Sequence, residues 1–313
     1  MRTGKLGATF EADAVQATIA DDAAAFIRKQ AQTQPSKPFF LYVPFASPHT
    51  PILPTKAFQG KTPTPYGDFC VELDHHIGRI LAALDETKSA DDTLVLFSAD
   101  NGCSPAANLA DLKAANHDPY QGRRGTKADL YEGGHRVPLL VRWPTGIAQP
   151  GRTVARLISL ADVYATCAET IKKRYPIDAA EDAFSFADVF DVAPPSATDA
   201  PIPRRTFDIH HSIHGAFAIR RGDLKLLMAP GSGGWSAPKP GQEPADAPRV
   251  QLYDLNLDPG ETKNLAVERP ETVAALRTLL KQSIENGRIT SGPPQPYVKR
   301  EKWPGLEWMA EKE

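Results

Sequence analysis

The sequence contains few cysteines and no long apolar run. Its cysteines, Cys70, Cys103 and Cys167, are too few and too scattered along 313 residues for a disulfide framework or a zinc cluster. No stretch reaches the apolar length of a membrane-spanning helix, so we expect no membrane span. The first residues lack the apolar core of a secretory signal peptide.

The sequence also lacks an excess of charge of either sign. It carries 36 basic and 38 acidic side chains, for a net charge of −2. Proteins that bind phosphate backbones usually have a clear basic excess, so we expect no nucleic-acid partner. With 41% hydrophobic residues, the chain is long enough to bury a large core and suits one large domain with a smaller one.

A buried strand followed by polar residues is predicted near the middle of the chain. Residues 93–97 form a short apolar run, which is typical of a strand buried on both faces of a parallel sheet. Asp100, Asn101 and Gly102 come directly after it, at the strand end where open α/β sheets bind ligands. An Asn-Gly pair is also a strong hairpin signal, but residues 103–108 do not alternate as a second strand would. The carboxylate and amide oxygens suit a hard cation.

A basic, glycine-flanked segment follows at 122–127. Arg123, Arg124 and Lys127 there could bind an oxyanion or simply form a solvated basic turn, and the residues alone favour the turn. The spacing and the missing hydroxyl residue after Lys127 exclude a Walker loop.

The preceding residues predict alternating helices and strands. Apolar residues at helical spacing predict helices over 13–33 and 66–87. Between them, 39–43 is predicted to be another buried strand. With the strand at 93–97 the pattern forms a βαβ unit of an α/β fold.

The amino-acid composition changes in the C-terminal half of the chain. Proline and alanine dominate 191–203, which predicts a linker, and 231–248 is predicted to be a long loop. Around these lie further predicted strands at 137–143, 153–159, 207–210, 215–220, 224–228 and 251–255, and predicted helices at 159–171 and 271–285. The four strands after 203 predict a small antiparallel sheet covered by the last helix.

Several motifs in a fixed order carry a family resemblance. The segments are FFLYVPFASPHTP, FSADNG, GTKADLYEGGHRVPLLVRWP and LYDLNLDPGETKNLA. In this order and spacing the chain resembles the type I, arylsulfatase-like sulfatases of the alkaline phosphatase superfamily. The resemblance implies that residues 1–195 are the C-terminal part of a catalytic α/β domain, a partial alkaline-phosphatase-like sandwich with a mostly parallel central sheet. It implies that residues 196–313 form an α+β subdomain with an antiparallel sheet.

The resemblance also implies roles for individual residues. Asp100 and Asn101 would bind Ca²⁺, with Mg²⁺ as the alternative. His49, which Pro48 and Pro51 bracket in a loop, and Lys127 would act in catalysis and bind the sulfate group, and His211 is a weaker candidate for substrate contact. His210, His211 and His214 are less well suited to a metal site because the ion of these enzymes prefers oxygen ligands. For Glu132 and the glycines after it we expect a structural role, with an ion pair to Arg136 that holds the loop.

Two parts of the family pattern have no counterpart in this sequence. The family's N-terminal half carries a paired-aspartate metal site and a C-x-P-S-R motif whose cysteine becomes formylglycine. Cys103-Ser104-Pro105 begins like that motif, but Ala107 stands where arginine is needed, so we reject Cys103 as the nucleophile. We therefore expect that an N-terminal portion is missing and that this chain is inactive alone.

The resemblance implies that the complete enzyme hydrolyses aryl or carbohydrate sulfate esters, with a sulfated small molecule or carbohydrate as its partner. Because such sulfatases are commonly exported, we expect a periplasmic or secreted location for the complete protein. A phosphodiesterase or phosphonate hydrolase of the same superfamily is the alternative in chemistry. A non-catalytic, carbohydrate-binding remnant of such an enzyme is the alternative from another functional class, that of binding proteins.

Overall fold

A computed structural model describes residues 7–8, 10–190, 203–295, 303 and 305–310. The predicted linker at 191–203 lies outside these residues except for Pro203. The chain divides into two compact units, and each is described separately. Unit 1 comprises residues 1–96, 104–119 and 141–145, and unit 2 comprises 97–103, 120–140 and 146–313.

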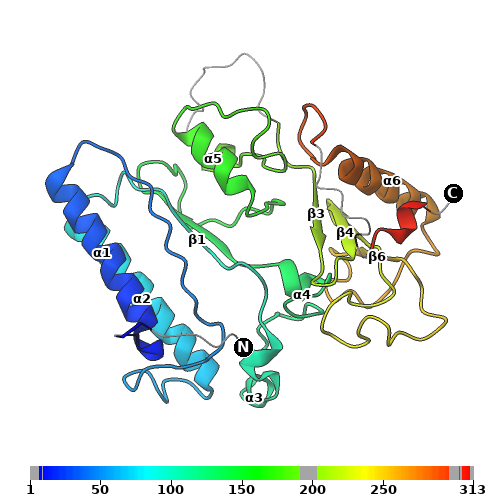
Figure 1. The fold of residues 1–313 in the computed structure, drawn as a ribbon, viewed down its shortest axis with the longest axis horizontal. Helices are drawn as coiled ribbons and strands as arrows, with labels where there is room; N and C mark the ends of the chain where they lie inside the picture. The colour runs from blue at the N-terminus through cyan, green and yellow to red at the C-terminus, as the bar shows by residue number, and fades with distance from the viewer. Residues whose placement is uncertain (1–6, 9, 191–202, 296–302, 304, 311–313) are drawn as a thin grey trace. The chain divides into compact units, whose positions relative to one another are not determined.

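Two long helices dominate unit 1. They are α1 (Val15–Thr33), which follows the 3-10 turn η1 (Ala12–Ala14), and α2 (Pro65–Glu86), and they pack side by side (Figure 1). Thr64 caps α2 by accepting a hydrogen bond from the Gly67 amide at 3.1 Å, and Pro65 occupies the first helical position. Both predicted helices are confirmed. Unit 1 also holds the 3-10 turn η2 (Pro105–Ala107) and the short helix α3 (Leu109–Ala114), which the sequence did not predict.

The predicted strand at 39–43 is wrong. The segment makes no strand ladder among the described residues. Phe39 and Leu41 pack against the core of α1 and α2, whereas Phe40 and Tyr42 are 79% and 75% exposed. Strand-forming side chains are not sufficient for a strand, because its backbone groups must pair with a neighbouring strand.

The mostly parallel central sheet is not confirmed. Among the described residues, β1 (Val95–Ser98) and β2 (Leu139–Arg142) form a two-stranded sheet. Both strands were predicted, within two residues at each end. The strand predicted at 153–159 is wrong, because no strand is present there. No helix of the described residues is both long and apolar enough to cross a membrane.

Unit 2 is built on a four-stranded antiparallel sheet. Its order is β3 (Phe207–His211), β4 (Phe217–Arg221), β5 (Leu224–Leu227) and β6 (Gln251–Asp254). All four predicted strands are confirmed, as is the covering helix α6 (Pro270–Asn286). Unit 2 also contains α4 (Glu132–His135), α5 (Asp162–Thr170), and the 3-10 turns η3 (Ala187–Phe190) and η4 (Glu307–Ala310). The predicted long loop at 231–248 holds no helix or strand.

The two faces of this sheet bury different partners. Ile219, Leu226 and Leu252 are paired across neighbouring strands and pack with Leu276 and Leu280 of α6. The alternate residues of the same strands face the other way, as the period of a strand requires. That second face buries Leu130 and Tyr131 against Ala218, Leu227, Ala229, Tyr253 and Leu255. The sheet therefore holds the segment that follows Lys127.

Candidate functional site

The Asp100–Asn101 loop begins where β1 ends. Asp100 is exposed and Asn101 is half-buried. The side-chain nitrogen of Asn101 donates to the Gly102 carbonyl oxygen at 3.0 Å. With its nitrogen used in this way, the amide presents Oδ1 as the atom able to bind a cation. A carboxylate and an amide oxygen are donors that Ca²⁺ prefers, so the chemistry of the pair fits the expected metal.

A close backbone contact joins this loop to α4. The Gly102 amide donates to the Gly134 carbonyl oxygen at 2.9 Å. A Cβ atom at Gly102 would lie 1.8 Å from the Gly133 carbonyl oxygen, so only glycine fits there. At Gly133 and Gly134 a Cβ atom would lie 2.3 Å from the Gly125 carbonyl oxygen and 2.7 Å from the Thr126 carbonyl oxygen, so the close backbone approach expected of these two glycines is confirmed.

Lys127 is held next to the same loop. Its amide donates to the Cys103 carbonyl oxygen at 2.9 Å, and the Tyr120 hydroxyl donates to that oxygen at 3.1 Å. The Lys127 side chain is half-buried. The structure thus brings together the backbone of two predicted site segments, 100–103 and 126–136, which lie in one unit.

The turn that carries Lys127 is fixed by a buried carboxylate, Asp129. Its Oδ2 accepts from the Thr126 amide at 2.8 Å, and its Oδ1 accepts from the Trp235 and Ser236 amides at 2.7 and 3.0 Å. The Ser236 hydroxyl donates to Oδ2 as well. Asp129 is 0% exposed. The long loop at 231–248 therefore holds the Lys127 turn, a role that sequence reasoning missed.

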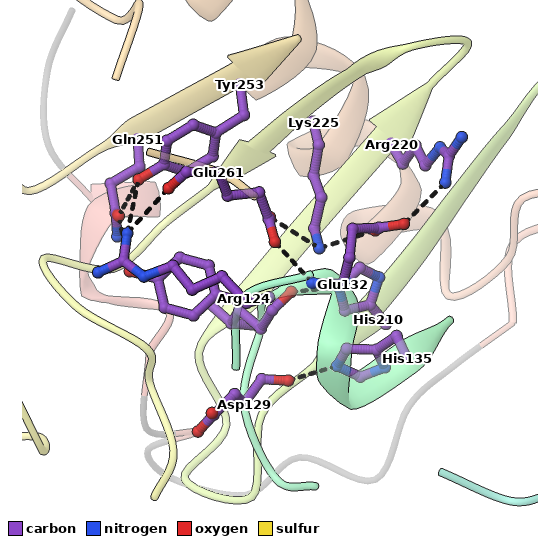
Figure 2. Close-up of polar contacts among 12 residues, drawn as sticks. Arg124, Asp129, Glu132, His135, His210, Arg220, Lys225, Gln251, Tyr253 and Glu261 are labelled. Carbon is purple, nitrogen blue, oxygen red and sulfur yellow. Dashed lines mark hydrogen bonds and ion pairs between the residues drawn. The ribbon is translucent and has the colours of Figure 1, made fainter. Parts of the chain in front are cut away.

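Glu132 lies at the centre of a buried network (Figure 2). Its Oε1 is 2.9 Å from Lys225 Nζ and its Oε2 is 3.0 Å from Arg220 Nη1, so its partners are not the expected Arg136. The Glu132 amide donates to Glu261 Oε2 at 2.7 Å. Lys225 Nζ lies 3.2 Å from Glu261 Oε1, though not in hydrogen-bond geometry. Lys225 and Glu261 are both fully buried.

The two carboxyl groups of this network have opposite pKa shifts. Burial alone would raise the pKa of Glu132, but the charges of Lys225 and Arg220 lower it below its usual value. Burial raises the pKa of Glu261, and the charge of Lys225 offsets this only in part. The lowered pKa keeps Glu132 ionised at neutral pH.

Arg124, in the glycine-flanked basic segment, forms internal contacts. Its Nη1 donates to the Glu261 carbonyl oxygen at 3.0 Å, and its guanidinium carbon lies 4.1 Å from the centre of the Tyr131 ring. Gln251 Oε1 accepts from the hydroxyls of Tyr131 and Tyr253 at 2.9 and 2.6 Å (Figure 2). Arg124 thus packs the loop against the sheet, which neither the anion-site nor the solvated-turn interpretation predicted.

Two histidines stack between α4 and β3. The rings of His135 and His210 are 3.8 Å apart between centroids. The Nε2 atoms lie 2.6 and 3.1 Å from the carbonyl oxygens of Asp129 and Leu130, respectively. Burial and the nearby charge of Lys225 lower the pKa of His135 to about 4. Burial and the neighbouring His135 lower the pKa of His210 well below its usual value. Both rings are therefore neutral at pH 7 and donate Nε2–H to these carbonyls.

The remaining predicted site residues lie at the surface of their units. His211 is exposed, and its Nδ1 donates to the Ser212 carbonyl oxygen at 2.8 Å. Its ring lies 5.9 and 6.0 Å from the rings of Phe217 and Trp303. His49 belongs to unit 1 and is also exposed, with Nδ1 2.8 Å from the Thr50 carbonyl oxygen. The functional roles of His49, Asp100, Asn101, Lys127 and His211 stay predictions.

Comparison with known proteins identifies the family. The family model described as Sulfatase matches residues 10–172, more than half of the chain. The chain therefore belongs to the sulfatase family. It is 30% identical to an N-acetylgalactosamine-6-O-sulfatase of Bacteroides thetaiotaomicron, an alignment that covers 89% of this chain and 52% of the relative. It is 31% identical to human arylsulfatase A over 87% of this chain and 53% of that protein, and 33% identical to mouse steryl-sulfatase over 80% and 41%.

Solved structures show the same fold. A structure from work on glycosaminoglycan metabolism by Bacteroides thetaiotaomicron aligns with a TM-score of 0.71 at 29% identity and covers 87% of this chain and 55% of that one. A sulfatase from Pseudoalteromonas sp. aligns with a TM-score of 0.69 at 22% identity, over 90% of this chain and 55% of that one. These neighbours are sulfatases with an α/β fold. The chain spans about half the length of the curated relatives it matches.

Proposed function

We propose that this chain supplies part of a catalytic site that hydrolyses aryl or carbohydrate sulfate esters. The observation that carries the proposal is the backbone contact between the Asp100–Asn101 loop and the Lys127 loop, through Gly102 with Gly134 and Cys103 with Lys127. The names of the relatives include an N-acetylgalactosamine-6-O-sulfatase, which favours a sulfated carbohydrate as substrate. We also propose a periplasmic or secreted location for the complete protein, since sulfatases of this kind are commonly exported.

We propose that the domain boundary lies near residue 195. Residues 1–195 would belong to a catalytic α/β sandwich with a mostly parallel central sheet. Residues 196–313 would form the subdomain, whose antiparallel sheet supports the Lys127 segment through Leu130 and Tyr131.

In this proposal Asp100 and Asn101 hold Ca²⁺, with Mg²⁺ as the alternative. The bound ion would neutralise charge on the sulfate oxygens. Ca²⁺ takes roughly six to eight oxygen ligands, so these two side chains supply only part of its shell. Among the described residues no group of three or more histidine, cysteine or acidic side chains is placed to hold a metal ion. Weak binding of Ca²⁺ by this chain alone follows from that small donor set.

Lys127 provides the positive charge of the site in this proposal. Its ammonium group binds a sulfate oxygen and stabilises the negative charge that grows on the leaving oxygen. His49 binds a second sulfate oxygen, and His211 contacts the remainder of the substrate. Because His211 lies beside the rings of Phe217 and Trp303, a sugar or aryl ring reaching it would meet an apolar surface.

The residues of this sequence do not fit the formylglycine nucleophile of the family. The sequence has no C-x-P-S-R motif, and Ala107 replaces the arginine that Cys103 would need. The carbonyl oxygen of Cys103 instead receives hydrogen bonds from Lys127 and Tyr120. We therefore assign no covalent step to this chain and expect it to show no sulfatase turnover alone.

A chimaera tests the proposal. The chain is fused behind the N-terminal region of the Bacteroides N-acetylgalactosamine-6-O-sulfatase and produced with a formylglycine-generating enzyme. Lys127→Ala should lower kcat on an aryl sulfate by a factor of roughly 100 to 1000, the effect of losing one donor to a developing oxyanion. Lys113→Ala, an exposed lysine of α3, is the control and should leave kcat unchanged.

Three outcomes would contradict the assignments. An unchanged kcat in Lys127→Ala would show that this lysine has no catalytic role and belongs to a solvated basic turn. Faster turnover of a phosphonate or phosphate ester than of the sulfate would favour the rival chemistry. Binding of a 6-sulfated sugar without turnover by the chimaera would favour a non-catalytic remnant.

A further inference from the structure

The ionised side chain of Glu132 is almost fully enclosed by protein. It is bound on one oxygen by Lys225 of β5 at 2.9 Å and on the other by Arg220 of β4 at 3.0 Å (Figure 2). Its amide is bound by Glu261 at 2.7 Å. The side chain of Glu132 is thus bound to the C-terminal sheet, and its backbone amide is bound to the loop after β6.

The two residues that follow Glu132 are hydrogen-bonded to the loop of Arg124 and to the predicted metal loop. Gly133 donates its amide to the Arg124 carbonyl oxygen at 2.7 Å, and the Gly134 carbonyl oxygen accepts from Gly102 at 2.9 Å. Gly133 and Gly134 have no side chains of their own to pack. Their position therefore depends on backbone hydrogen bonds and on the side chains of both neighbours, Glu132 and His135, whose Nε2 lies 2.6 Å from the Asp129 carbonyl oxygen.

We propose that Glu132 is a positioning residue, which uses its buried charge to hold the Asp100–Gly102 loop and Lys127 in one arrangement. The inference rests on the proposed function of those two segments. A buried ion pair is a poor source of net stability, because desolvation cancels much of the attraction. It does restrict geometry, since the carboxylate must stay within hydrogen-bond distance of both cations. Glu132 therefore fixes the start of α4, and Gly102 and Cys103 follow through the backbone contacts described above.

Amide hydrogen exchange of the 313-residue chain tests this role without substrate or metal. In Glu132→Gln, exchange at the Gly102 and Lys127 amides should become faster by about tenfold or more, the scale expected for losing hydrogen bonds to a charged group. These amides are the donors to Gly134 and Cys103.

Asp162→Asn is the matched control. Asp162 is also a buried carboxylate in an ion pair, with Arg205 at 2.6 Å, and it lies in the same unit. It accepts from the Ser159 and Phe184 amides at 3.0 and 2.8 Å, so these amides are the ones expected to exchange faster in the control. Equal acceleration of Gly102 and Lys127 in both variants would show a general loss of stability and overturn the proposal. Unchanged exchange of these two amides in Glu132→Gln would also overturn it.

If Glu132→Gln does not fold, two milder variants of Arg220 test the same role of the Glu132 charge. Arg220→Gln removes one partner of Glu132 and should speed exchange at Gly102 and Lys127, whereas Arg220→Lys keeps the charge and should restore most of the protection. Equal exchange in the two Arg220 variants would contradict a role for the charge. Since exchange does not depend on catalysis, an inactive chimaera would count against the proposed function and leave this inference standing. Wild-type exchange rates in the variants would count against the positioning role of Glu132 and leave the proposed function standing.

Discussion

The position of Lys127 depends on the conformation of the residue after it. Ala128 has φ +82°, a left-handed conformation that is unfavourable for a residue with a Cβ atom. Its carbonyl oxygen accepts from the Ile213 amide at 3.0 Å, and Asp129 closes the turn through its bonds to the Thr126 amide and to the 231–248 loop. These contacts on both sides hold the strained residue in place.

Ala128→Gly should stabilise the protein. Glycine adopts positive φ freely, so the substitution relieves strain of about 1 kcal/mol, reduced by the greater freedom of glycine in the unfolded chain. We expect a net gain of roughly 0.5 kcal/mol in the free energy of unfolding, measured by urea titration. Ala114→Gly, at an exposed position in α3, should instead cost up to about 1 kcal/mol. Destabilisation by Ala128→Gly would show that the turn is unstrained.

The contact between the rings of His135 and His210 joins α4 to β3. Each neutral ring donates to a backbone carbonyl of the segment 129–130, which packs on the sheet. Protonation would place a positive charge beside a second imidazole and near Lys225 in a poorly solvated position. The contact between these two elements is therefore favoured only while both rings are neutral.

Stability should fall as pH decreases from about 6.5 to 4. The unfolded chain binds a proton at His135 near pH 6.5 and the folded chain only near pH 4, so the unfolded state holds more protons in this window. Above pH 6.5 this contribution is fully present, and at pH 5 about 2 kcal/mol of it should be lost. The measurement is the free energy of unfolding at pH 7.5 and 5.0. His135→Gln should reduce the difference, and His117→Gln, at an exposed position, should not. Equal pH dependence in wild type and His135→Gln would refute the prediction.

The described units leave large apolar side chains in contact with solvent. In unit 1 the alternate residues of segment 39–42 differ in exposure: Phe39 and Leu41 are partly buried against the helices, while Phe40 and Tyr42 are exposed. Neighbouring exposed aromatic side chains on an unpaired extended backbone favour association with other chains.

We therefore expect the chain to self-associate and expect the Phe40→Ser/Tyr42→Ser double variant to raise its monomer fraction in size-exclusion chromatography. Its free energy of unfolding should change by less than about 0.5 kcal/mol, because both side chains are exposed. Leu41→Ser, in the same segment, should lower that free energy by about 1 to 3 kcal/mol and leave association no better. A monomeric wild-type chain, or a double variant that associates as before, would contradict the expectation.

Much of the local structure was predictable because its causes are local. Apolar residues at a period of 3.6 marked α1, α2 and α6, and short alternating runs between turns marked the four strands of the antiparallel sheet. The motif order around Asp100, Lys127 and His49 was sufficient to predict the family, which the match over residues 10–172 confirms. These features depend on residues within one helix, strand or loop.

The partners of the buried charges could not be predicted from local patterns. Glu132 binds Lys225, 93 residues away, and not Arg136, and Asp129 binds Ser236, 107 residues away. The apolar runs at 39–43 and 153–159 were predicted as strands but are not, because strand formation requires a neighbouring backbone that no local pattern specifies. The family, the candidate residues and the amphipathic elements thus followed from local patterns of residues. Which charges meet and which extended segments pair depended on long-range packing, since both require groups that are distant along the chain.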